Sequence, residues 1–206
     1  MLNSLPRTLL MRFWNNTQKS TKLNTSLGAC TQLETTPRFT TTAQTNPEVE
    51  EVRVDMAGMK VESKPVELVT SVGSCVAICL HDPANKCGGL AHVMLPDSSA
   101  FPHELLPAKF ADTAVPALAK AVRICNGQQT RLTAKIAGGA NMFPNLKCDI
   151  FSVGEKNVEA VKIALINNRI RIVGEDVGGC YGRRVSFNVI TGVATIRRYK
   201  GELKTI

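Results

Sequence analysis

Aromatic residues, long apolar runs and a regular cysteine spacing are all scarce in this sequence of 206 residues. Aromatic side chains make up 5% of the chain, so surfaces on which nucleic-acid bases could stack are few. No stretch approaches the roughly 18 apolar residues of a membrane-spanning helix, and we expect no membrane insertion. The seven cysteines follow no disulfide framework and no secretory signal peptide is recognisable, which favours a reducing compartment and a cytoplasmic location.

The composition nevertheless suits a folded domain. Hydrophobic residues make up 44% of the chain, enough for a packed core, and the length allows one ordinary domain plus a tail. The net charge of +8 would suit an acidic partner. Because lysine and arginine are scattered along the sequence and aromatics are few, we expect no nucleic-acid binding.

Residues 1–50 differ in composition from the rest of the chain. They are rich in serine and threonine, contain no acidic residue before Glu34, and have weak helical or strand periodicity. This is typical of a disordered tail, or of an extension upstream of the true start, with Met56 and Met59 as candidate initiators. It also fits a transit peptide, which is basic, hydroxyl-rich and poor in acids. We expect a disordered or targeting-like tail at 1–50 and a folded domain at 51–206.

Short apolar runs and two amphipathic segments alternate along residues 51–206. Helical spacing of apolar residues predicts helices over 113–124 and 155–166. Brief apolar runs bounded by turn residues predict strands around 52–54 and at 66–69, 76–80, 132–136, 170–174, 185–189 and 193–197. This alternation predicts an α/β fold, a layered sandwich of a mixed sheet with two main helices.

Three of the seven cysteines and two of the three histidines lie between residues 69 and 97. Cysteine and histidine are zinc ligands, so a metal site is one interpretation. If residues 75–80 form a strand, however, Cys75 and Cys79 are roughly 13 Å apart at about 3.3 Å per residue. One tetrahedral zinc ion with bonds of about 2.3 Å cannot bridge that distance. The spacing argues against zinc, and we expect neither a metal nor an organic cofactor.

Cys75 and His92 also suit a nucleophile and its base. Cys75 follows Gly73-Ser74, where a flexible backbone can turn an N–H toward a substrate carbonyl. A strand, a turn and a returning strand would place His92 beside it. The alternative is that both are packing groups of an apolar core, and composition and spacing leave the two interpretations open. His81 and His103 lie near prolines in turn-like segments, and we expect both to be solvated.

Seven short blocks of the sequence, all in order, resemble the chemoreceptor glutamine deamidases, the CheD family. The blocks are GSCVAICL (73–80), GGLAHVMLP (88–96), FADTAV (110–115), AKIAGGANMF (134–143), GEKNV (154–158), GEDVGG (174–179) and GRRV (182–185). Any one block is modest evidence, whereas all of them in this order are specific. The resemblance extends over residues 52–198, and the N-terminal tail has no counterpart in it.

The resemblance implies an α/β sandwich that hydrolyses selected glutamine side chains on methyl-accepting chemotaxis receptors to glutamate, with release of ammonia. It assigns the nucleophile to Cys75 and the base to His92, acting through a thioester. The backbone N–H groups around Ser74 and Cys75 are our candidates for the oxyanion donors, and Gly73 belongs to the same site loop. In many systems the family also has a chemotaxis phosphatase as a partner.

A threonine upstream of the cysteine completes the family's triad. It lies five or six residues before the cysteine in different members; here the five-residue position is Thr70 and the six-residue position is Val69. Because neighbouring strand residues point to opposite faces, only one of them can face His92. We expect Thr70 to do so, with its hydroxyl accepting a hydrogen bond from the ring and fixing the tautomer.

Two other functions stay open. One is an adaptor that binds receptors or a chemotaxis phosphatase with little or no catalysis, and the other is an amidase acting on a different protein. The deamidase hypothesis expects Cys75 to be a reactive thiol of low pKa, which alkylating agents modify faster than the other six cysteines.

Overall fold

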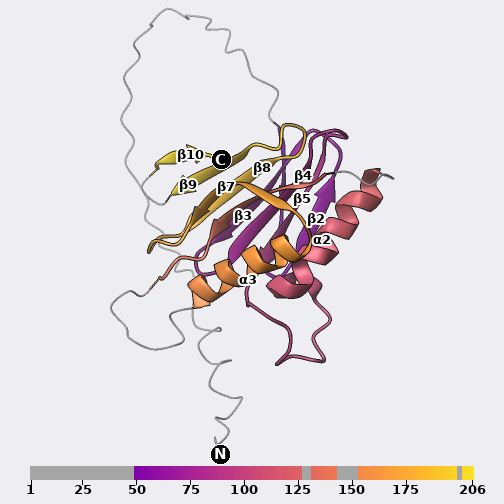
Figure 1. Ribbon diagram of the computed structural model, residues 1–206. Helices are drawn as coiled ribbons and strands as arrows, with labels where there is room; N and C mark the ends of the chain where they lie inside the picture. Colours follow the sequence, from indigo (N-terminus) through magenta and orange to yellow (C-terminus); the bar gives the residue numbers. More distant parts are fainter. Residues whose placement is uncertain (1–48, 127–130, 143–152, 199–200) are drawn as a thin grey trace, which may run out of the picture. The chain divides into compact units, whose positions relative to one another are not determined.

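The computed structural model describes residues 49–126, 131–142, 153–198 and 201–206. Within these residues the chain forms two five-stranded sheets and two α-helices, which stack as three layers (Figure 1). One apolar core lies between the two sheets, and a second lies between the second sheet and the helices. The predicted layered α/β sandwich is confirmed. The predicted tail, residues 1–50, lies outside the described residues except for its last two.

The first sheet carries one of the candidate site residues, Thr70. Its strand order is β1-β3-β8-β9-β10. These strands are β1 (Glu50–Arg53), β3 (Val66–Val72), β8 (Arg183–Asn188), β9 (Ala194–Arg198) and β10 (Leu203–Thr205). β1 runs parallel to β3, and the other neighbours are antiparallel. Side chains alternate along β3, so Thr70 is buried inside the sandwich while Ser71 is exposed on the outer face.

The second sheet forms the middle layer. Its order is β2-β5-β4-β6-β7, made of β2 (Met59–Glu62), β5 (Cys87–Val93), β4 (Val76–Asp82), β6 (Thr133–Gly138) and β7 (Arg171–Val177). Every residue of β4 and β5 is buried, because these central strands are covered on both faces. This explains why both strands read as near-continuous apolar runs in the sequence.

Helices α2 (Ala111–Asn126) and α3 (Val153–Asn167) form the third layer, and a short 3-10 helix, η1 (Pro107–Lys109), precedes α2. Ile78 and Leu80 of β4 pack in the core on the helical side, whereas Ala77 and Cys79 pack in the core between the sheets. Odd-numbered residues at this end of β4 therefore face the first sheet. None of the helices in the described segments is long and apolar enough to cross a membrane.

The expectation that His81 is solvated is wrong. β4 continues through His81 to Asp82, which places the imidazole between the sheets, edge-on to Phe187 with ring centroids 6.3 Å apart. The sequence reasoning ended the strand two residues too early, at Leu80. His103 is exposed, as expected.

Candidate active site

Thr70 and His92 meet across the gap between the two sheets. The Thr70 Oγ1 lies 2.8 Å from the Nδ1 of His92, and it also donates a hydrogen bond of 2.9 Å to the Val54 carbonyl. A hydroxyl has one proton, so the oxygen that donates to Val54 accepts from the Nδ1–H of the ring. This fixes the tautomer and leaves the Nε2 lone pair free.

The strand pairing places Cys75 on the same face as His92. In the β4–β5 hairpin, Ala77 is the direct partner of His92. Cys75 lies two residues before Ala77 and borders the same core between the sheets. It is therefore the diagonal neighbour of His92, at a spacing of about 7–8 Å between Cα atoms, which long side chains can bridge. The hairpin thus brings the two residues to one end of the sandwich.

The pKa values of both His92 and Cys75 are shifted by burial. Burial lowers the pKa of the His92 imidazole, an effect that the nearby Asp55 carboxylate opposes. Burial also raises the pKa of the Cys75 thiol, while its own backbone N–H has the opposite, smaller effect. Both shifts favour the uncharged forms of the two side chains at neutral pH. The His92 Nε2 is buried without a hydrogen-bond partner among the described residues, so its lone pair is available as a base.

The low thiol pKa expected for Cys75 is wrong for the resting protein, because sequence reasoning did not include its burial. Cys125 and Cys180 are exposed, whereas Cys75 is half-buried. A simple alkylating agent will therefore not single out Cys75. A thiol in this state needs a base to take its proton before it can attack a substrate, and His92 is the candidate base.

Hydrogen bonds hold the segment before the β4 strand at three successive carbonyls. The Gly73 carbonyl accepts from the Ala140 N–H and the Cys75 carbonyl accepts from the Gly139 N–H, both at 2.8 Å. Between them, the Ser74 carbonyl accepts from the Asn157 side chain at 3.1 Å. The backbone around the thiol is thus fixed from two directions, by the turn after β6 and by α3.

A glycine is required in that turn for a steric reason. Gly138 has a φ of 118°, and a Cβ there would lie 2.2 Å from the Cys75 carbonyl oxygen. Any side chain would push the turn away from Cys75 and break the contact. The Gly138-Gly139 pair is therefore a tight turn against the candidate nucleophile.

Asn157 is the site residue that sequence reasoning missed. It is fully buried on α3, and its Nδ2 also donates to the Met94 carbonyl at 2.9 Å. One amide group therefore ties the segment of Cys75 to the end of the strand that carries His92. The available signal was an asparagine, a poor helix former, at a buried position of a predicted helix.

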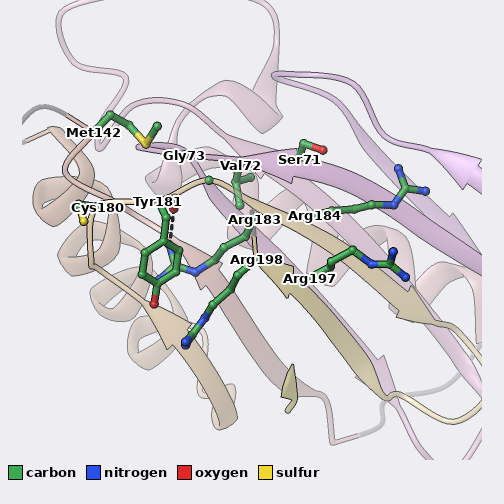
Figure 2. Close-up of a pocket in the computed structure, with 11 residues that line it drawn as sticks. Ser71, Val72, Gly73, Met142, Cys180, Tyr181, Arg183, Arg184, Arg197 and Arg198 are labelled. Atoms are coloured by element: carbon green, nitrogen blue, oxygen red, sulfur yellow. Dashed lines mark hydrogen bonds between the residues drawn. The ribbon is translucent and has the colours of Figure 1, made fainter. Parts of the chain in front are cut away.

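Two neighbouring cavities are lined by residues of the candidate site. One, of about 350 Å³, is lined by Thr70 and His92. The other is a groove of about 720 Å³ that Gly73 lines together with four arginines (Figure 2). Ser71 and Arg184 line both, so the two hollows adjoin at these residues.

Comparisons with known proteins show which family this chain resembles. Residues 94–198 match the family model described as CheD chemotactic sensory transduction. A "Probable chemoreceptor glutamine deamidase CheD" of Desulforamulus reducens is 43% identical over 158 residues, covering 76% of this chain and 95% of the relative. Proteins with the same name from Methanococcus maripaludis and Clostridium kluyveri are 43% and 42% identical, each covered over 99% of its length.

The chain belongs to the CheD family. An aligned stretch of 158 residues in a chain of 206 necessarily contains residues 70–92, so the relative from Desulforamulus reducens covers all three candidate residues. The CheD family model begins at residue 94 and covers the segment that holds Asn157. The roles of the individual residues rest on their geometry.

Proposed function

We propose that this protein is a chemoreceptor glutamine deamidase, which hydrolyses the side-chain amide of receptor glutamines to glutamate and ammonia. The observation that carries the proposal is the Thr70–His92 hydrogen bond, which leaves the Nε2 of a neutral histidine free on the face that Cys75 shares. Membership of a family whose relatives are named as probable chemoreceptor glutamine deamidases supports the substrate.

The reaction proceeds in two halves. In the first, the Cys75 Sγ attacks the glutamine carboxamide carbon while the His92 Nε2 takes the thiol proton. The imidazolium then gives that proton to the amide nitrogen, the C–N bond breaks, and ammonia leaves a thioester behind. In the second half, His92 takes a proton from water, the resulting hydroxide attacks the thioester carbon, and the thiolate leaves and recovers its proton. The sum is glutamine plus water giving glutamate plus ammonia.

The neighbouring groups hold this pair in position. Thr70 keeps the proton of His92 on Nδ1, so that Nε2 faces the reaction as a base. Asn157 and the turn at Gly138 fix the backbone of Cys75, whose N–H, with that of Ser74, we assign to the oxyanion. Fixing these groups before the reaction lowers the cost of aligning them in the transition state.

The test is incubation with the cytoplasmic fragment of a chemoreceptor, followed by mass spectrometry of each glutamine-containing peptide and an ammonia assay. The expected result is conversion of specific glutamines to glutamate by the wild-type protein and no conversion by Cys75→Ala. Cys125→Ala is the matched control, because that thiol is exposed on α2, and it should retain full activity. Equal activity of Cys75→Ala and Cys125→Ala would contradict the proposal.

One observation favours a second candidate, an adaptor that binds receptors or a chemotaxis phosphatase without turnover. The thiol of Cys75 is half-buried and its pKa is raised, as in a packing cysteine. An adaptor would bind the receptor fragment equally well with Cys75→Ala and would leave every glutamine intact. An amidase with another target would release ammonia only from that other protein.

A further inference from the structure

Two arginines face each other directly across neighbouring strands near the candidate active site. Arg184 of β8 and Arg197 of β9 are Cα partners in an antiparallel ladder, and both are exposed on the outer face of the first sheet. Figure 2 shows their side chains extending in the same direction from the groove. Like charges directly opposite each other in a sheet destabilise the fold. The arrangement therefore fits a site that an anion neutralises.

The described carboxylates around the groove pair with only one of these two arginines, and that ion pair is exposed. Arg183 and Arg198 bind the buried Asp176, at 2.7 and 2.8 Å. Arg184 forms an exposed ion pair with Glu51. Arg197 has no carboxylate within ion-pair distance in the described part of the chain.

The pair is placed to act on a bound substrate. Arg184 lines both the groove and the cavity that contains Thr70 and His92, and Gly73, two residues before Cys75, also lines the groove. A protein segment whose side chain enters the active site would lay its neighbouring residues along this groove. Those neighbours would then lie along the same groove that Arg184 and Arg197 line.

We propose that Arg184 and Arg197 bind carboxylate side chains that flank the target glutamine, so that the protein selects acidic segments of its substrate. This inference rests on the proposed function. The planar guanidinium matches a carboxylate with two parallel hydrogen bonds. A nucleic acid fits the groove poorly, because its one aromatic ring, Tyr181, has the Arg183 and Arg198 guanidiniums within 4.5 and 4.9 Å of its centre and cannot easily stack on bases.

Because the two arginines act in binding, their loss should raise KM and leave kcat unchanged. The variants are Arg184→Gln, Arg197→Gln and both together. We expect the double variant to raise KM for the receptor fragment about tenfold and to weaken the salt dependence of kcat/KM. The matched control is Arg171→Gln, an exposed arginine of β7 in the second sheet, which should leave KM unchanged.

A second readout separates this inference from the proposed function. Binding of the receptor fragment is measured to the inactive Cys75→Ala protein, with and without Arg184→Gln and Arg197→Gln. The same measurements are repeated with a fragment in which the acidic residues beside the target glutamine are changed to glutamine. If the arginines bind these acidic residues, removing both partners should weaken binding by less than the sum of the two separate losses. If the wild type deamidates nothing yet this coupling is found, the docking surface holds and the proposed function fails. Unchanged binding in the double variant, or equal loss in Arg171→Gln, would overturn the inference.

Discussion

Replacing Thr70 by valine tests the orientation of the candidate base. Valine has nearly the shape of threonine but removes the acceptor for the Nδ1–H of His92 and the donor to the Val54 carbonyl. The freed imidazole can then carry its proton on Nε2, where it no longer acts as a base toward the thiol. We expect a loss in transition-state stabilisation of about 1–3 kcal/mol, which lowers the deamidation rate about ten- to a hundredfold.

The same substitution should also destabilise the fold, because it leaves two buried polar groups without partners. We expect the free energy of unfolding to fall by about 2–4 kcal/mol, so activity is compared after correction for the folded fraction. Thr70→Ser is the control, since it keeps the hydroxyl and should keep most of the activity. A Thr70→Val protein with full activity per folded molecule, or a Thr70→Ser protein as slow as Thr70→Val, would refute the reasoning.

Three more predictions concern the frame of the site, its pH dependence and the N-terminal tail. Asn157→Leu leaves the Ser74 and Met94 carbonyls without their donor and should slow deamidation at least about tenfold. An unchanged rate would show that the site does not need this amide. Because burial lowers the pKa of His92, activity should stay constant at neutral pH and decline only as the pH falls below about 6.5. The free energy of unfolding should also fall as the pH falls, because the unfolded chain binds the histidine proton at a higher pH than the folded one. A deamidation rate that already drops between about pH 8 and 7 would contradict a neutral His92 in the resting protein. A protein that starts at Val49 should melt cooperatively and deamidate as fast as the full chain, and a lower melting temperature would assign residues 1–48 a structural part.

The parts of the structure that depend on neighbouring residues could be predicted from the sequence. The two helices follow from apolar spacing, and each begins two residues before its predicted start. The β4–β5 hairpin places Cys75 near His92 because only a short turn separates the two strands. The strands β2 and β10 were not predicted. They lie at sheet edges and are short, so little apolar pattern marks them.

The parts that depend on distant packing could not be predicted. Asn157 acts on Ser74 across 83 positions of the chain, through the docking of α3 on the end of the second sheet. The pairing of Arg184 with Arg197 follows from the register of β8 and β9, which no local motif reveals. The raised pKa of the Cys75 thiol is a consequence of burial, a property of the assembled sandwich.

The most direct test of the central claim is covalent trapping by a receptor peptide whose target glutamine is replaced by a chloroketone analogue. Its electrophilic carbon lies close to the position of the carboxamide carbon, so only a thiol placed to attack that site reacts quickly. Peptide mapping should find the adduct on Cys75, although Cys125 and Cys180 are more exposed, and His92→Ala should slow its formation strongly. An adduct on Cys125 or Cys180 instead, or one that forms on Cys75 equally fast without His92, would contradict the account.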